Sequence, residues 1–473
     1  MDLEKKFEEV KGYIGQIEYL THSIVLVDWD MRTNMPVKAG ESRSKVLEYL
    51  SSQLFDMTTS TKVKTFIEEL SPYKDNMSLV QRRILEELER NYNETMKIPA
   101  DRYVASVGAT SRAQIAWEKA KEENDYESFK PHLQKVIDFS REFIDYWGYE
   151  GDKYNTLLEK YERGLTVEKL DKVFGELRDG IVEILENIKK SKKTIDTNIL
   201  KGNFDILKQK DLSLCILQKM GFDLEAGRLD VSVHPFTTNM GNKDVRLTTN
   251  YHKDEFTSAL FSTIHESQSR FYENIVGRSE EFTTYLLNLS RKYFEDFNKI
   301  SPEEFYEAMN KVEPSFIRTE ADELTYSLHI IIRYELEKDL INGRISLDQL
   351  PSEWNKKYKE YLGVEPTNDT DGVLQDVHWS ASLFGYFPSY ALGNLYGAQI
   401  YNTLLNEKPE IMKEVGEGNL RNLHSWLKEN VHKFGSLYTP SEIIKRVTGE
   451  ELNSKYFINY LKEKYYKIYN INK

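Results

Sequence analysis

Residues 78–92, SLVQRRILEELERNY, decide the fold class, because their apolar side chains repeat with the period of an α-helix. The repeat is formed by Val80, Ile84, Leu88 and Tyr92. Apolar residues at steps of four lie on one face of a helix, whereas a half-buried strand alternates every second residue. The stretch therefore predicts an amphipathic helix, and similar patterns extend through residues 3–193.

The pattern changes in residues 221–251, where apolar and polar side chains alternate. Alternation is present in residues 229–234, and again in residues 245–249 after a turn-forming Gly-Asn-Lys at 241–243. Such alternation is typical of short strands that are buried on one side. We therefore expect a small β-hairpin or short sheet in this region.

Helical periodicity resumes at Lys253 and continues to the end of the chain, apart from a Gly-rich and aromatic segment at residues 372–397. No repeat, low-complexity region or linker marks a boundary between domains. We predict a mainly α-helical protein that forms a single domain over residues 1–473.

Composition and charge exclude several classes of partner. The 473 residues carry a formal net charge of -13, whereas nucleic-acid binding depends on clustered Lys and Arg. The lysine run within residues 189–193 is expected to be a solvated helix end. Cys215 is the only cysteine, as is typical of a reducing compartment. With no apolar signal segment and no apolar run near the roughly 18 residues that cross a bilayer, we expect a cytoplasmic protein with no nucleic-acid or membrane partner.

The stretch HESQS at residues 265–269 begins like the zinc-binding helix pattern H-E-x-x-H and departs from it at the last position. In that pattern two histidines at i and i+4 bind zinc, and the glutamate activates a metal-bound water. Ser269 replaces the second histidine, and protein ligands of zinc are Cys, His and carboxylates. The structural alternative is a hydrogen-bonded core His265, with Glu266 paired to Arg270 at i+4.

Further motifs occur in order along the chain. They are His234-Pro235-Phe236, Asp244-x-Arg246-x-Thr248, Ile317-Arg318-x-x-Ala321-Asp322, Gly372-x-x-Gln375-Asp376-x-His378-Trp379 and Phe384-Gly385-Tyr386-Phe387-Pro388. Together with HESQS they resemble the carboxypeptidase Taq family of zinc metallocarboxypeptidases over essentially the whole chain. The resemblance implies long helices around a deep substrate groove, with the small β-hairpin or sheet near the site. It also implies zinc or cobalt as cofactor, peptides with a free C-terminus as substrates, and a homodimer.

The resemblance further implies two His-Glu pairs where this chain has one. In the family the first pair belongs to H-E-x-x-H, and the second opens an H-E-S-Q-S segment whose glutamate resembles the third zinc ligand. Here residues 256–264 resemble the approach to the first pair, and residues 267–279 resemble the sequel to the second. The chain reads as if everything between the pairs were deleted. We expect one continuous helix from Phe256 through Arg270 and beyond.

The fusion leaves two roles open for the surviving pair. By analogy with the first pair, His265 is a zinc ligand and Glu266 is the base that activates water. By analogy with the second pair, Glu266 is itself a metal ligand. Either assignment leaves at most two of the three protein ligands that a catalytic zinc normally has. The chain therefore binds zinc in an incomplete site or binds no metal.

Other groups near the pair are poor replacements for the missing ligands. Gln268 and Ser269 are too weakly basic, and Glu273 lies about 12 Å farther along the helix at the standard rise per residue. His234 and His378 would serve only if the helix shifted toward them.

The resemblance assigns substrate-binding roles to further residues. Arg246 resembles an arginine that binds the terminal carboxylate of a substrate, for which a bidentate guanidinium is well suited. The alternative for Arg246 is an ion pair with Asp244. His378 resembles a catalytic group that contacts substrate or stabilises an oxyanion. Tyr386 either donates a hydrogen bond beside it or has a structural role.

Two other residues are expected to support the site without contacting the metal ion or the substrate. Asp322 resembles a carboxylate that orients a metal-binding histidine, and Arg318 lies four residues before it in the same motif. The alternative is that Arg318 and Asp322 pair with each other on a helix face.

Three functional hypotheses follow. The resemblance implies a metallocarboxypeptidase that releases C-terminal amino acids from peptides, with Glu266 and His378 as catalytic residues. The incomplete motif motivates the second, a catalytically inactive peptide-binding or relic protein on the same scaffold, a pseudoenzyme without metal. In the third, the lost segment leaves a cavity or misjoined helices that destabilise the fold. Metal content, peptidase assays and cooperative thermal unfolding distinguish the three.

Overall fold

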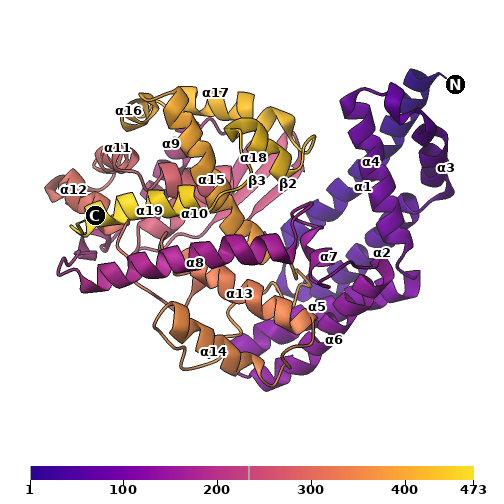
Figure 1. Ribbon diagram of the computed structural model, residues 1–473, viewed down its shortest axis with the longest axis horizontal. Coiled ribbons are helices and arrows are strands. Elements are labelled where there is room, and N and C mark those ends of the chain that lie inside the picture. Colours follow the sequence, from indigo (N-terminus) through magenta and orange to yellow (C-terminus); the bar gives the residue numbers. More distant parts are fainter. Residues whose placement is uncertain (1, 233–234, 473) are drawn as a thin grey trace. The chain divides into compact units, whose positions relative to one another are not determined.

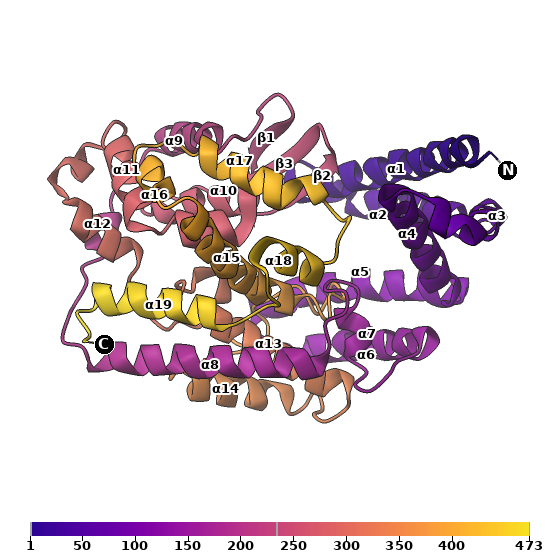
Figure 2. The same ribbon diagram turned by 45° about the horizontal axis from the view of Figure 1, so that its top comes forward.

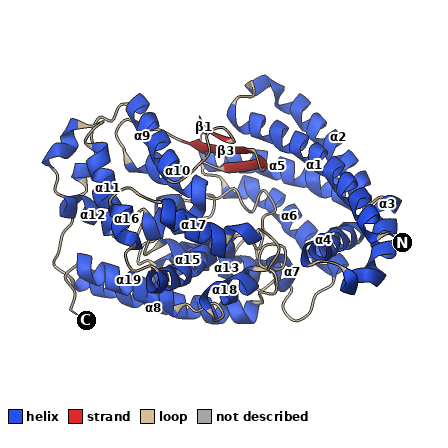
Figure 3. Cartoon of the chain, turned by 90° about the horizontal axis from the view of Figure 1, so that it is seen from above, coloured by secondary structure: helices blue, strands red, loops and turns tan. Residues whose placement is uncertain are grey.

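The computed structural model describes residues 2–232 and 235–472, except for the side chains of residues 37, 44, 268 and 269. Helices make up 67% of the structure, and the strands form one small sheet (Figures 1 and 3). The predicted mainly α fold is therefore confirmed. No helix in the described ranges is long and apolar enough to cross a membrane. The deep groove stays a prediction.

The elements divide into two compact units, each assembled from segments that are not contiguous in sequence. Unit 1 comprises Met1–Pro99, Asp205–His252 and Thr257–Ser267, and unit 2 comprises Ala100–Phe204, Lys253–Phe256 and Gln268–Lys473. Because segments far apart in sequence complete each unit, no single cut separates the two. The predicted single domain stays a prediction.

Unit 1 begins with the helices α1 (Leu3–Thr33), α2 (Gly40–Thr58), α3 (Thr61–Leu70) and α4 (Leu79–Met96). The helix predicted from residues 78–92 is confirmed, and Ser78 and Gln81 form a capping box at its start. Leu85 is fully buried in a small core shared by α1, α3 and α4. Val80, by contrast, is 55% exposed. The prediction thus identified the helix, and its buried residue Leu85 lies beside the predicted stripe.

A three-stranded sheet in unit 1 combines one parallel and one antiparallel pairing. Its strands are β1 (Gly227–Val231), β2 (Thr237–Gly241) and β3 (Asp244–Thr249), in the order β1-β3-β2. β3 is parallel to β1 and antiparallel to β2. The predicted small sheet is confirmed, but the two predicted strands are parallel neighbours and not a hairpin. The hairpin partner of β3 is β2, and Val233, predicted in the first strand, lies outside the described residues.

Helix α10 (Thr257–Arg270) carries the HESQS stretch and continues without a break into a π-helical turn at Phe271–Val276. The predicted continuous helix is therefore confirmed. The division between the units falls inside α10, since its residues through Ser267 belong to unit 1 and the rest to unit 2. Unit 1 also contains α9 (Ile206–Lys219). Helix α10 thus contributes residues to both units.

Unit 2 contains the larger core. Its helices are α5 (Ala100–Glu123), α6 (Tyr126–Trp147), α7 (Asn155–Leu158), α8 (Val167–Lys190), α11 (Glu280–Ser290), α12 (Pro302–Met309), α13 (Tyr326–Ile341), α14 (Leu350–Tyr361), α15 (Phe387–Glu407), α16 (Ile411–Gly416), α17 (Arg421–Asn430), α18 (Pro440–Thr448) and α19 (Lys455–Ile468). Helices α8 and α19 lie side by side, and α13 packs against α8 and α15 (Figure 2). Arg333 and Glu337 on α13 are fully buried, so both charges must be paired inside the protein.

Candidate functional site

The surviving His-Glu pair lies in the part of α10 that belongs to unit 1. Leu260 and Ile264 on this helix are buried, whereas His265 and Glu266 are partly exposed. Thr237 Oγ1, at the start of β2, lies 2.5 Å from the Oε2 atom of Glu266 and 2.7 Å from its carbonyl oxygen. The threonine hydroxyl therefore holds the carboxylate of Glu266 against the edge of the sheet.

The alternative pairing of Glu266 with Arg270 is wrong. Arg270 Nη1 is 2.7 Å from Glu273 Oε2, at i+3 instead of i−4. The guanidinium of Arg270 also stacks on the ring of Tyr326, 3.7 Å from its centroid. The carboxylate of Glu266 is therefore bound by Thr237 and not by Arg270. Glu273, which was considered as a replacement metal ligand, forms an ion pair with Arg270.

Among the residues that the structure describes, those that could hold a metal ion do not form a complete set. Within neither unit do the described residues bring together three His, Cys, Asp or Glu side chains in a group suited to a metal ion. His265 and Glu266 are adjacent in sequence, and side chains at i and i+1 of a helix do not face each other. His234 and the side chains of Gln268 and Ser269 lie outside the described residues.

Arg246 on β3 forms the ion pair that was the structural alternative for it. Its Nε and Nη2 atoms donate to the two carboxylate oxygens of Asp244, both at 2.9 Å, and its guanidinium lies 4.7 Å from the ring centre of Trp29. Its neighbour across the sheet is Arg228, whose guanidinium lies 5.5 Å from the same ring centre and pairs with Asp230. Arg246 is thus already oriented by a carboxylate, and its role toward substrate stays a prediction.

The predicted pairing of Arg318 with Asp322 on a helix face is also wrong. Arg318 begins a 3-10 turn that ends at Glu320, and Ala321 is extended, so the spacing of i and i+4 does not bring the side chains together. Asp322 instead accepts hydrogen bonds from the backbone N–H groups of Thr325, at 3.0 Å, and Glu313, at 3.1 Å. Burial raises the pKa of Asp322 above its ordinary value, although these hydrogen bonds oppose the shift.

Arg318 belongs to a buried charge cluster with Asp376 and Arg333. Its Nε and Nη2 atoms donate to Asp376 Oδ1 at 3.0 and 2.8 Å, and Arg333 Nε donates to Oδ2 at 2.6 Å. Burial by itself would raise the pKa of Asp376, but the two guanidinium groups outweigh burial and hold this pKa well below its usual range. Asp376 is therefore ionised at any physiological pH and fixes both arginines.

His378 lies two residues beyond Asp376 and is enclosed by aromatic rings. Its ring centre is 4.4 Å from that of Phe387 and 6.0 Å from that of Tyr386. Its Nε2 atom is 3.3 Å from the hydroxyl of Tyr390. Its Nδ1 atom is 3.9 Å from Asp376 Oδ1, too far for a hydrogen bond, and has no hydrogen-bond partner among the described residues. Tyr386 stacks beside His378, but the hydroxyl within hydrogen-bonding distance of Nε2 belongs to Tyr390.

We expect His378 to remain neutral between about pH 5 and pH 8. Burial, and after it the positive charge of Arg318, lowers the pKa of His378 to about 3. An ordinary histidine has a pKa of about 6.5, so its ring-proton NMR signals would move through this range. Those of His378, assigned with a His378→Asn variant, should not show the full shift that protonation of an imidazole produces. A full protonation shift with a midpoint between pH 5 and pH 8 would contradict the neutral imidazole.

Sequence reasoning missed three residues around Arg318 and His378. Asp376 stands within a motif that gave it no role, although a carboxylate two residues before a histidine is a usable signal. Arg333 interrupts the apolar run of α13, and an arginine inside such a run indicates a buried ion pair. Tyr390, one of thirty tyrosines, gave no signal of its own.

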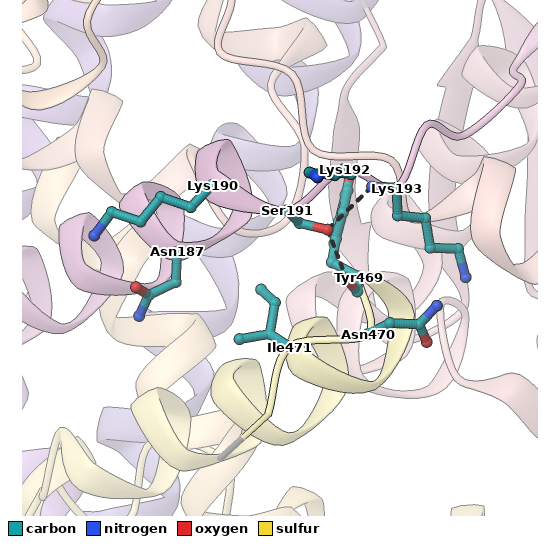
Figure 4. Close-up of a pocket in the computed structure, with 8 residues that line it drawn as sticks. All are labelled: Asn187, Lys190, Ser191, Lys192, Lys193, Tyr469, Asn470 and Ile471. Atoms are coloured by element: carbon teal, nitrogen blue, oxygen red, sulfur yellow. Dashed lines mark hydrogen bonds between the residues drawn. The ribbon is translucent and has the colours of Figure 1, made fainter.

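A cavity of about 610 Å³ lies elsewhere in unit 2, where α8 ends beside the end of α19 (Figure 4). It is lined by Asn187, Lys190, Ser191, Lys192, Lys193, Tyr469, Asn470 and Ile471. Ser191 Oγ donates to the carbonyl of Tyr469 at 2.8 Å, and Lys193 pairs with Glu307. Lys190 and Lys192 are exposed, in keeping with the predicted solvated helix end.

The whole chain is similar to known carboxypeptidases. The family model described as "Carboxypeptidase Taq (M32) metallopeptidase" matches residues 9–267 and 262–465. Carboxypeptidase 1 of Bacillus subtilis (strain 168) is 40% identical over 499 aligned positions, which cover 99% of this chain and 100% of the relative. Thermostable carboxypeptidase 1 of Thermus thermophilus is 34% identical, with the same coverage.

Solved structures agree with the sequence comparison. The M32 carboxypeptidase from Deinococcus radiodurans R1 superposes with a TM-score of 0.94 at 30% identity, covering 99% of this chain and 100% of that one. The Pyrococcus furiosus carboxypeptidase superposes with a TM-score of 0.92 at 32% identity, covering 97% and 99%. Sequence and fold agree over the full length, and the chain therefore belongs to the carboxypeptidase Taq (M32) family of metallopeptidases.

Proposed function

We propose that this chain, a metallocarboxypeptidase by family, retains peptide binding and has lost most or all of its metal-dependent activity. One observation carries the proposal, namely that within neither unit do the described residues group three side chains able to bind a metal ion. A catalytic zinc normally has three protein ligands. The described residues therefore do not fit the divalent metal ion that the family implies.

The comparisons support a deletion as the cause. The family model matches in two segments that overlap at residues 262–267, around the single His-Glu pair. The alignment with the Bacillus subtilis relative spans 499 positions, more than the 473 residues of this chain. We propose that the segment between the two family pairs is missing here and that residues 265 and 266 are what remains of both.

Elemental analysis and a peptidase assay test the proposal together. We expect purified protein, equilibrated with zinc and then desalted, to retain far less than one zinc per chain, because two candidate ligands cannot form a catalytic site. Release of C-terminal amino acids should stay near background and should not respond to a chelator. Calorimetry should still detect binding of a peptide with a free C-terminus and weaker binding of the same peptide with an amidated C-terminus.

One zinc per chain with chelator-sensitive release of amino acids would contradict this proposal and support an active carboxypeptidase instead. That second candidate is favoured by relatives that are 34–40% identical over the full chain and are named carboxypeptidases. It would use zinc or cobalt and would need a third ligand, for which His234 and His378 are the histidines weighed from the sequence. Arg246, Glu266 and His378 would then have the roles expected from the resemblance.

We also propose that the protein is a cytoplasmic homodimer. The family resemblance supports the dimer, and the presence of only one cysteine supports a reducing compartment. Light scattering should give about twice the 55.5 kDa mass of one chain, and the monomer mass would contradict the dimer.

A further inference from the structure

Glu337 is a fully buried carboxylate that joins three separate segments of unit 2. It projects from α13 and accepts a hydrogen bond at Oε1 from Trp379 Nε1, at 2.8 Å. Its Oε2 atom accepts from the hydroxyl of Tyr154, at 2.5 Å, and from the backbone N–H of Gly385, at 3.0 Å. All three donors are therefore on segments other than α13.

Two of these donors flank the residues expected to contact a peptide. Trp379 directly follows His378, and Gly385 directly precedes Tyr386. Gly385 has a φ of +90°, and a Cβ atom there would lie 2.8 Å from the carbonyl oxygen of Leu157. The loop is thus in close contact with its surroundings at the point where Glu337 binds its backbone.

The same helix fixes the start of the loop through a second charge. Arg333 lies one turn before Glu337 and donates to Asp376 at 2.6 Å. Residues at i and i+4 share one face of a helix. This face of α13 therefore binds the loop of residues 376–386 at three points, through one cation and one anion.

We propose that Glu337 is a positioning residue for peptide binding, because its hydrogen bonds hold the 376–386 loop and so set the orientation of His378 and Tyr386. It does not touch the peptide itself. This inference rests on the proposed peptide-binding function, but the geometry of the loop can be tested without a peptide.

The protonation state of Glu337 gives the loop a measurable signal. Burial raises the pKa of Glu337 to about 7, against the hydrogen bonds from Tyr154, Gly385 and Trp379 and the charge of Arg333. On its own helix, Glu337 faces the charge of Arg333. From the segment around α7 it is faced by Tyr154 and Tyr161. When the carboxyl group of Glu337 loses its proton, its hydrogen bond from the indole N–H of Trp379 becomes stronger, since hydrogen bonds to charged groups are stronger.

The first experiment follows the indole Nε1–H signals of the six tryptophans by NMR as the pH is raised. The Trp379 signal is assigned as the one lost in Trp379→Phe. It should shift with a midpoint near pH 7 in the wild-type chain and should not titrate in Glu337→Gln. A Trp379 signal whose position Glu337→Gln leaves unchanged would overturn the inference.

Glu337→Gln is informative because an amide cannot satisfy all three donors. If the NH₂ group of the introduced glutamine takes the place of Oε2, it faces the N–H donor of Gly385 and no acceptor lies between them. If it takes the place of Oε1, it faces the indole N–H donor of Trp379 in the same way. The loop must therefore move in either orientation. Trp379→Phe is the milder variant, because it removes one donor and opposes none, and it keeps the test informative if Glu337→Gln does not fold.

Glu323→Gln is the matched control. Glu323 is also buried and accepts from Tyr460, Lys464 and Tyr465 at 2.9, 2.6 and 3.1 Å, but none of these residues lies in the loop. We expect Glu337→Gln to weaken binding of a free-C-terminus peptide at least tenfold and Trp379→Phe two- to fivefold, while Glu323→Gln stays within twofold. Equal losses in the two Glu→Gln variants would show that the effect is general destabilisation and would refute positioning.

The ring signals of His378 separate failure of this inference from failure of the proposed function. They should move in Glu337→Gln and not in Glu323→Gln, whether or not a peptide binds. If the wild-type chain binds no peptide but the His378 signals move as expected, the proposed function fails and the positioning role stands. If peptide binds and the His378 signals do not move, the positioning role fails alone.

Discussion

Insertion of the missing family segment between Glu266 and Ser267 is expected to raise bound zinc to about one per chain and peptidase activity by roughly a thousandfold. The insert is the segment that the family resemblance places from the residue after the first His-Glu pair through the second pair. This restores three ligands, the usual number at a catalytic zinc. A catalytic metal ion contributes several kcal/mol to transition-state stabilisation, and each 1.4 kcal/mol or so changes the rate tenfold.

The control for the restored chain is the same chain with His265→Ala, which keeps the inserted segment and removes one ligand. It should lose both the zinc and the gain in activity. Elemental analysis and release of C-terminal amino acids are the two measurements. A restored chain that binds no more zinc than the original would show that the deletion is not what limits metal binding.

Asp376→Asn is expected to destabilise the protein by about 3–5 kcal/mol, the usual cost of removing one partner from a buried ion pair. The side chains of Arg318 and Arg333 are only 8% and 0% exposed, and the substitution removes the charge of the carboxylate to which both guanidinium groups donate. Chemical denaturation measures the change in the free energy of unfolding. The control is Glu183→Gln, whose pair with Lys462 is 58% and 38% exposed and should contribute less than about 1 kcal/mol.

The sign of the pH dependence follows from the lowered pKa of Asp376. A carboxyl group whose pKa is lower in the folded state stabilises the protein above its unfolded pKa, about 3.9 for Asp, and loses that effect as the pH falls toward the folded value. The folded pKa lies well below the usual range. The difference between wild type and Asp376→Asn should therefore persist to about pH 4. If the two free energies of unfolding differed by only about 1 kcal/mol at neutral pH, water or structural rearrangement would be stabilising the charges of the two arginines.

Most of the fold could be predicted from the sequence because helical periodicity is a local property. The α4 helix follows from the spacing of apolar residues within its segment, whereas the continuous α10 helix was expected from the resemblance of residues 256–279 to two joined family segments. The partner of a strand is not local. Alternation identified β1 and β3, but nothing within either strand specifies that they are parallel neighbours. The sequence of β2, Thr-Thr-Asn-Met-Gly, does not alternate apolar with polar residues, although the burial of its side chains does alternate.

The site was predicted less well, because motif residues were assigned contacts from their spacing. Arg318 and Asp322 are four residues apart, which implies a pair only on a regular helix, and the chain there is a short 3-10 turn followed by extended backbone. The true partner of Arg318 is Asp376, which lies far away in sequence. For Arg246 the nearby Asp244 was the correct partner, because residues two apart in a strand share a face.

The interleaved segments of the two units constrain the order in which the chain can fold. During synthesis the α1–α4 segment emerges first, but unit 1 also needs α9, the sheet and α10, and so it cannot be completed before Ser267 has been made. The intervening residues 100–204 belong to unit 2, which in turn awaits the C-terminal helix α19. Domains generally fold as units, the N-terminal one first. Here the contacts of α1 with β2 can form only after the ribosome has added more than one hundred further residues.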